Sequence, residues 1–318
     1  MKSTMLRLAL QNLSLLLFVT LVVAFGILSP KFLTLANAMN ILIQSAPMAV
    51  VAVGMTFVLL TAGVDLSVGA IMFVGGAVAA KLLLAGQPVA LACLAMLGCG
   101  LAFGAINAWF ITRGKLAPFI VTLATLFIGR GFALWLTQTR ALNLPEWFLH
   151  LGSVRIAGVP LPIAAFGGVV ALAHIVLSRT PFGRQMYAVG NHPENARAAG
   201  IQVSRLIFIV YVISGLCSAL GGILALAQLG AVSPKFGENY EFKAIAAAVL
   251  GGTSLFGGRG GVWPGTVLGT LLIQTLESGL VMLNINPYLY PLVTAAVIFI
   301  AILIDSIRRR LTAVSSSQ

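Results

Sequence analysis

Long apolar runs separated by short polar breaks dominate this sequence. A helix that spans a membrane needs about 20 mostly apolar residues, and breaks at glycine, proline or charged residues divide the chain into about ten such candidates. The predicted spans are residues 10–28, 41–60, 68–84, 89–110, 119–136, 161–177, 206–226, 242–250, 262–283 and 288–304. The eighth is short and runs into a glycine-rich stretch, which predicts half a helix followed by an irregular segment. Eight spans with a re-entrant hairpin therefore stay open beside ten spans.

Composition indicates the same class of protein. Hydrophobic residues make up 59% of the 318 residues and charged residues only 8%, whereas charged residues make up about 25% of a soluble globular protein. We therefore predict an all-α fold, a polytopic transmembrane helical bundle that forms a single domain over residues 1–318.

The charge distribution predicts an orientation in the membrane. The net charge is +12, but the basic residues are spread over short loops and form no single patch, so nucleic acid is not an expected partner. With the N-terminus in the cytoplasm, basic residues in the cytoplasmic loops outnumber those in the outer loops two to one, as the positive-inside rule requires. We expect both termini in the cytoplasm, an even number of spans, and a first span that is retained.

Residues 61–69 (Thr-Ala-Gly-Val-Asp-Leu-Ser-Val-Gly) place one carboxylate, Asp65, between two long uncharged runs. An acid in such a position is costly and often marks a function, and the neighbouring glycines and serine allow a helix to break. Two interpretations stay open: a short cytoplasmic turn in which Asp65 caps the next helix, or a discontinuous helix that lines a solute path. A further glycine-rich break at 251–261 would give one or two broken helices in all. The candidate pathway residues of the motif are Gly63, Asp65, Ser67 and Gly69.

Arg130 and Glu277 are charged residues inside predicted spans and are further candidate pathway residues. Counted from the predicted cytoplasmic ends of their spans, they lie about 20 Å and about 22 Å deep at about 1.5 Å per residue. Because an isolated charge in hydrocarbon is costly, one hypothesis is an ion pair between them. The alternative is that Arg130 extends to the membrane surface while Glu277 faces the aqueous path alone.

The longest predicted cytoplasmic loop, 178–205, carries the signals of a short helix. Pro193 suits the first helical position, with Asn191 or the residue after it as the cap. Glu194 favours the positive end of the helix dipole, and Gly200 suits a left-handed helix ending. A helix of about two turns is marginal in isolation, so we expect this one to dock against a partner.

Four motifs stand out: the nine residues at 61–69, Tyr-Ala-Val-Gly-Asn at 187–191, Ala-Ala-Gly-Ile at 198–201, and Ala-Ile-Ala-Ala-Ala-Val-Leu-Gly-Gly-Thr-Ser-Leu-Phe-Gly-Gly at 244–258. Together they resemble the permease subunits of bacterial ABC importers for monosaccharides of the ribose type, and the resemblance covers nearly the whole chain. The sequence departs from that family at Ala62, where a glycine is usual, and at Lys243, where an aspartate is frequent. The second departure reverses a charge at the predicted outer mouth, so the identity of the sugar stays open.

The resemblance implies a multi-pass permease of the bacterial inner membrane. Two copies, as a homodimer, would form one translocation pathway, with a periplasmic sugar-binding protein outside and a cytoplasmic ATPase that drives the cycle. The chain has no glycine-rich phosphate-binding loop ending in Gly-Lys-Ser/Thr, so ATP would be used by the ATPase subunit, and this chain is expected to bind no cofactor and to be no enzyme. The residues expected at the ATPase contact are Asn191, Pro193, Glu194, Arg197, Ala198, Ala199, Gly200 and Ile201.

A second function class stays open, an ion- or proton-coupled secondary transporter of a small polar solute. It too has about ten spans and a membrane-embedded carboxylate, but it needs coupling acids, and only Asp65 and Glu277 lie deep in the chain. A membrane-embedded enzyme would need clustered catalytic side chains, which the sequence lacks. The three cysteines and three histidines are scattered without metal-ligand spacing, so no metal site is expected.

Overall fold

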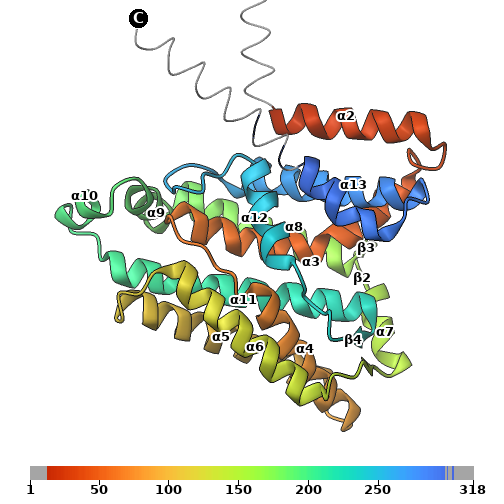
Figure 1. Cartoon of the computed structure of the whole chain (residues 1–318), viewed down its shortest axis with the longest axis horizontal. Coiled ribbons are helices and arrows are strands. Elements are labelled where there is room, and N and C mark those ends of the chain that lie inside the picture. The colour runs from red at the N-terminus through yellow and green to blue at the C-terminus, as the bar shows by residue number, and fades with distance from the viewer. Residues whose placement is uncertain (1–12, 298, 300–302, 304–318) are drawn as a thin grey trace, which may run out of the picture.

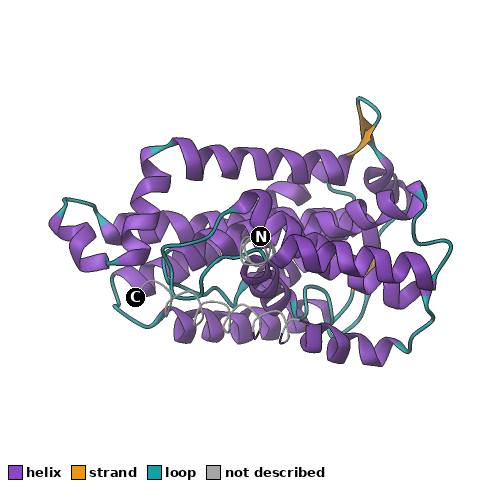
Figure 2. Ribbon diagram, turned by 90° about the horizontal axis from the view of Figure 1, so that it is seen from above, coloured by secondary structure: helices purple, strands orange, loops and turns teal. Residues whose placement is uncertain are grey.

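The computed structural model describes residues 13–297, 299 and 303, and within this part of the chain the protein is a bundle of helices (Figure 1; Figure 2). In chain order the longer elements are α2 (Leu13–Leu28), α3 (Leu35–Leu60), α4 (Val68–Leu84), α5 (Val89–Thr112), α6 (Pro118–Thr137), α7 (Glu146–Ser153), α8 (Leu161–Arg179), α9 (Pro181–Asn191), α10 (Pro193–Ala198), α11 (Val203–Leu229), α12 (Tyr240–Leu250) and α13 (Val267–Met282). A π-helical turn, η1 (Val262–Thr266), leads into α13, and a 3₁₀ turn, η2 (Pro287–Leu289), precedes a helical stretch at 290–297.

Four two-residue strands, which the sequence did not predict, join loops between the helices. β1 (Leu142–Asn143) pairs with β4 (Ala231–Val232), and β2 (Arg155–Ile156) pairs with β3 (Val159–Pro160), both in antiparallel register. These ladders are too short to change the class, so the predicted helical fold is confirmed.

The predicted apolar runs coincide with helices throughout the described residues. The prediction for 68–84 has the bounds of α4, and α11 extends the prediction for 206–226 by three residues at each end. In the part of the chain that the structure describes, six helical segments are long and apolar enough to cross a membrane, namely α3, α5, α6, α8, α11 and Val262–Met282, and the apolar helices α2 and α4 are shorter. Residues 10–12 of the first predicted span, much of 298–304 in the last, and both chain termini lie outside the described residues.

The eighth predicted segment is half a helix, as expected from its length. α12 has 11 residues, which at about 1.5 Å per residue reach only about half of the roughly 30 Å hydrocarbon thickness. The loop 251–261 follows, and Gly252, Gly257, Gly258 and Gly260 adopt positive φ there. The chain resumes its helical path only at η1.

α3 is the central helix of the bundle. Every residue from 45 to 60 is buried, and the helix contacts α11, α8, α12 and α13. Lipid supplies no hydrophobic drive between helices, so close packing of small residues has to hold such a bundle together. The contact between α5 and α11 illustrates this, since a Cβ atom on Gly215 would lie 2.1 Å from the carbonyl oxygen of Gly100.

The two ends of the bundle carry different elements. In Figure 1, α9 and α10 project at one end, while α7 and strands β2 to β4 gather at the other. The predicted cytoplasmic loop 178–205 and the predicted outer loops therefore lie at opposite ends of the helices. Within that cytoplasmic loop the sequence predicted one helix, whereas the structure has two, α9 and α10.

Candidate functional site

The motif at 61–69 forms the break between α3 and α4. At the end of α3 the amides of Thr61 and Gly63 both donate to the carbonyl of Val58. Between them, Ala62 adopts a left-handed φ of 60°. Asp65, three residues after Ala62, has no exposed surface. The break thus carries the carboxylate into the helical bundle and away from solvent.

Asp65 is held by a polar network. Its Oδ1 accepts hydrogen bonds from the amide and the hydroxyl of Ser67, at 3.0 and 2.6 Å, and its Oδ2 accepts one from the hydroxyl of Ser214 on α11, at 2.7 Å. Asn107 of α5 donates to Ser67 Oγ at 2.9 Å and accepts from Thr125 of α6 at 2.8 Å. One carboxylate therefore connects the break to three other helices.

The glycines of the motif allow other chain segments to approach the break. A Cβ atom on Gly63 would lie 2.6 Å from the hydroxyl oxygen of Tyr211, which itself donates to the carbonyl of Val64 at 3.2 Å. A Cβ atom on Gly69 would lie 2.2 Å from the carbonyl oxygen of Gly237. A larger residue at either position would clash with these atoms, so both positions require glycine whatever role the two residues have in a pathway.

This geometry bears on the two interpretations of Asp65. Its bond to the Ser67 amide fixes the entry to α4, where Ser67 is the N-cap residue and makes no capping bond with its own side chain. Gly63, Asp65, Ser67 and Gly69 are all buried in this conformation. Asp65 therefore positions the break from within the bundle, and its role in a solute path stays a prediction.

Arg130 and Glu277 do not pair, so the proposed ion pair between them is wrong. Glu277 of α13 accepts from Lys243 Nζ of α12 at 2.6 Å, and the two side chains are 24% and 35% exposed. Equal depth along two helices does not place their side chains on facing sides. Lys243, which the sequence places at the predicted outer mouth, lies in the first turn of α12, three residues after the helix begins.

Arg130 instead lies near a second acid that the sequence analysis did not single out. Its guanidinium carbon is 5.9 Å from the centre of the Phe73 ring, and its Nη2 is buried without a hydrogen-bond partner. Glu241 of α12 is an electrostatic neighbour of Arg130, is 4% exposed, and has an unpartnered Oε2. Among the described residues, then, Arg130 on α6 and Glu241 on α12 are electrostatic neighbours of opposite charge that form no ion pair.

A double-mutant cycle tests the Lys243–Glu277 pair. Because both side chains are partly exposed, we expect Lys243→Met and Glu277→Gln to show a coupling free energy of about 1 kcal/mol in thermal or denaturant unfolding of the purified protein. Arg130→Gln with Glu277→Gln serves as the control cycle and should be additive. Additive effects in the first cycle, or coupling in the second, would contradict the observed pairing.

At the end that carries α9 and α10, the predicted coupling residues fall on two helices. Asn191 is the last residue of α9, and its side chain donates to the carbonyl of Tyr187, so of the two predicted caps it is the following residue that caps the short helix. α10 begins at Pro193 with His192 as the N-cap residue, and Glu194 pairs with Arg197 at 2.6 Å. The residues from 193 to 200 are exposed except Ala196.

Gly200 terminates α10 in the predicted left-handed conformation, with φ +82°. The Gly200 amide donates to the carbonyl of Arg197, and the Ile201 amide donates to that of Ala196. This pair of hydrogen bonds is the glycine-dependent Schellman motif, which satisfies the last carbonyls of the helix. The end of α10 therefore has a defined shape although it projects from the protein.

α9 anchors this projection to the membrane helices. A Cβ atom on Gly190 would lie 1.9 Å from the carbonyl oxygen of Leu60, the last residue of α3, and the same carbonyl accepts from the amide of Gly258 at 3.0 Å. The Tyr187 hydroxyl donates to the carbonyl of Gly260 at 2.9 Å. α9, the end of α3 and the glycine-rich loop 251–261 thus meet directly next to the motif at 61–69.

Comparison with known proteins identifies relatives along most of the chain. The family described as branched-chain amino acid transport system / permease component matches residues 37–302. The ribose import permease protein RbsC of Bacillus subtilis (strain 168) is 42% identical over 90% of this chain and 89% of its own length. The ribose import permease protein RbsC of Escherichia coli (strain K12) is 38% identical over 93% of this chain and 94% of its own length. The D-allose transport system permease protein AlsC of the same strain is 39% identical over 90% of this chain and 88% of its own length. No solved structure matches the chain.

These matches confirm the resemblance that the four sequence motifs predicted. They also agree with a fold made of apolar helices and with the absence of a nucleotide-binding loop from the sequence. The chain therefore belongs to the ABC-importer permease family described as the branched-chain amino acid transport system permease component, among whose members it is similar to the ribose and allose permeases.

Proposed function

We propose that this sugar-importer permease carries a monosaccharide across the bacterial inner membrane, as a homodimer that works with a cytoplasmic ATPase and a periplasmic sugar-binding protein. Relatives named for ribose, D-allose and fructose support a monosaccharide as the substrate class. In this proposal the chain has ten spans with both termini in the cytoplasm, binds no nucleotide itself, and contacts the ATPase through the residues from 191 to 201.

The observation that carries the proposal is the exposed helix α10. It is only six residues long, which is too short to be stable alone, yet its end is capped by the Schellman bonds and α9 fixes its base against α3. A rigid projection of this kind transmits a push from a cytoplasmic partner to the break at 61–69. A secondary transporter has no need of such a lever, and the two acids it would use are sequestered, Asp65 by serines and Glu277 by Lys243.

Reconstitution tests the proposal. Proteoliposomes that contain the chain, its ATPase and its binding protein should take up labelled ribose only when ATP is present on the cytoplasmic side, and a protonophore should have no effect. Uptake that needs no ATP and stops with the protonophore would identify a secondary transporter instead.

Gly200→Val tests the ATPase contact. Valine is strained at a left-handed φ, although the space around Gly200 is open, so the substitution should distort the end of α10 without a clash. We expect about tenfold weaker ATPase binding, which corresponds to about 1.4 kcal/mol, with a matching loss of sugar-stimulated ATP hydrolysis.

Gly86→Val is the matched control for this substitution. Gly86 also has a positive φ, +76°, and open surroundings, but it follows α4 at the end of the bundle opposite α10. It should suffer the same backbone strain and leave ATPase binding within about twofold of the wild type. Equal losses in the two variants would indicate a general folding defect rather than a lost contact.

A further inference from the structure

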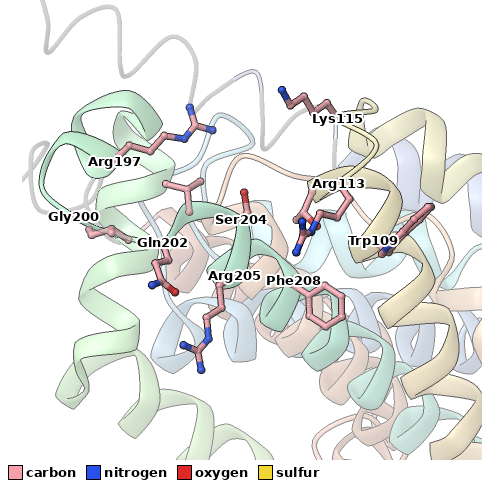
Figure 3. Close-up of a pocket in the computed structure, with 12 residues that line it drawn as sticks. Trp109, Arg113, Lys115, Arg197, Gly200, Gln202, Ser204, Arg205 and Phe208 are labelled. Carbon is pink, nitrogen blue, oxygen red and sulfur yellow. The ribbon is translucent and has the colours of Figure 1, made fainter.

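A large cavity opens beside α10, between the end of α5 and the start of α11. Its volume is about 1310 Å³, and Figure 3 shows side chains from α5 and from the α10–α11 connection pointing into it. It is lined by Trp109, Thr112, Arg113, Lys115, Arg197, Gly200, Ile201, Gln202, Val203, Ser204, Arg205 and Phe208.

The rim of this cavity is strongly cationic. Four of its lining residues are basic, Arg113, Lys115, Arg197 and Arg205, and none is acidic. Only Arg197 has an ion pair, with Glu194; within the part of the chain that the structure describes, the other three make none. The 27-residue helix α11 also begins in this wall, and the side chain of its N-cap residue makes no capping bond, so the positive end of its dipole adds to the same field.

Part of the cavity wall is apolar and continues along the membrane-facing helices. Trp109, which is 54% exposed, lies beside Arg113, and Phe208 lies on α11 above the Arg205 guanidinium in the view of Figure 3. Ile106, three residues before Trp109 on α5, and Ile209, which follows Phe208 on α11, are 47% and 36% exposed. Tryptophan is typical of the membrane interface, where an apolar ring borders polar groups. The cavity thus combines basic side chains with an apolar wall at the boundary of a spanning bundle.

We propose that this cavity binds an anionic phospholipid, with the headgroup phosphate among Arg113, Lys115 and Arg205 and the acyl chains along α5 and α11. This site goes beyond sugar transport. An acidic protein surface could pair with the basic rim but would leave the exposed isoleucines uncovered. A phospholipid satisfies both the basic groups and the apolar wall, and basic pockets between helices at a cytoplasmic surface suit anionic headgroups.

The position of the site gives the lipid a route to the ATPase contact. Arg197, Gly200 and Ile201 belong to α10 or its ending, and they line the same cavity. A bound lipid would therefore touch the segment that we propose as the coupling element.

Quenching of Trp109 fluorescence measures the binding. Purified full-length protein in neutral detergent is titrated with phosphatidylglycerol or phosphatidylcholine carrying brominated acyl chains, and the quenching that is lost in Trp109→Phe defines the signal from this site. Each basic side chain contributes about fivefold, so Arg113→Gln with Arg205→Gln should weaken phosphatidylglycerol binding about 30-fold. Arg113→Lys with Arg205→Lys retains the charge and should bind within about threefold of the wild type.

Arg179→Gln with Arg184→Gln is the matched control, because both residues are exposed basic groups of α8 and α9 outside the cavity and the change in net charge is the same. Phosphatidylglycerol affinity that falls only in the cavity variant, with both variants melting like the wild type, supports the site. Three results would overturn it: equal losses in the two glutamine variants, equal quenching by phosphatidylcholine, or displacement by soluble glycerol 3-phosphate at similar concentrations. Lost ATPase affinity with unchanged lipid binding in the cavity variant would overturn it too, in favour of a protein contact.

Discussion

Asp65→Ala is expected to destabilise the protein by about 3 kcal/mol, which is a large effect for one substitution. The carboxylate accepts three hydrogen bonds, from the amide and hydroxyl of Ser67 and from the hydroxyl of Ser214, and alanine leaves all three donors without that acceptor. Individual bonds inside membrane bundles contribute about 0.6 to 2 kcal/mol. Their sum should appear as a lower midpoint of thermal unfolding in detergent.

Asp65→Asn separates geometry from charge. Asparagine retains an oxygen for the two Ser67 donors but presents an amide group to Ser214, whose hydroxyl can rotate to accept. We therefore expect a loss of only about 1 kcal/mol, similar to that of Ser214→Ala. Normal stability with lost sugar uptake in Asp65→Asn would show that transport needs the charge itself.

Glu194→Ala is the matched control for Asp65→Ala. Glu194 is also a carboxylate, but its side chain is 82% exposed and pairs only with Arg197 on the same short helix. Its removal should change stability by less than about 0.5 kcal/mol. Equal midpoints of thermal unfolding for Asp65→Ala and Glu194→Ala would contradict the structural role of the buried network.

The extent of the helices was predictable because a single physical variable governs it. Charged residues, glycines and prolines interrupt apolar runs. The predicted helix ends at Leu60 and Leu84 therefore agree with the ends of α3 and α4. α9 was missed for the same reason, because Arg184 and Gln185 make its first turn resemble a loop. Its helical form depends on tertiary contacts through Gly183 and Gly190, which a hydropathy pattern does not contain.

The partners of individual charges were not predictable. Depth along a helix follows from counting residues, but the direction of a side chain around the helix axis depends on packing. That is why Glu277 was matched to Arg130 and not to Lys243. The carboxylate of Asp65 was identified, whereas its partner Ser214 and the linking Asn107 were not. A polar side chain deep in an apolar span was the available signal, since such groups must find partners inside the bundle.

Gly190→Ala is expected to separate ATP hydrolysis from transport. The added methyl group would lie 1.9 Å from the carbonyl oxygen of Leu60 and 2.5 Å from the amide nitrogen of Gly258, so one of the three segments has to move. Overpacking of this kind costs about 1 to 3 kcal/mol. The strain falls where α9 meets both the end of α3 and the glycine-rich loop, which is a direct link between α10 and the break at 61–69.

The functional consequence should exceed the loss of stability. α10 itself is unchanged, so ATPase binding should stay within about threefold of the wild type, while sugar uptake per ATP hydrolysed should fall about tenfold or more, because α9 no longer transmits motion to α3. Tyr187→Phe, which removes one hydrogen bond to the loop, should give a smaller loss in the same direction. Gly168→Ala is the control, since Gly168 lies in α8 with open space around it and alanine favours a helix. If Gly190→Ala imports sugar as efficiently as Gly168→Ala, the contact of α9 with Leu60 is not the link between the ATPase and the pathway.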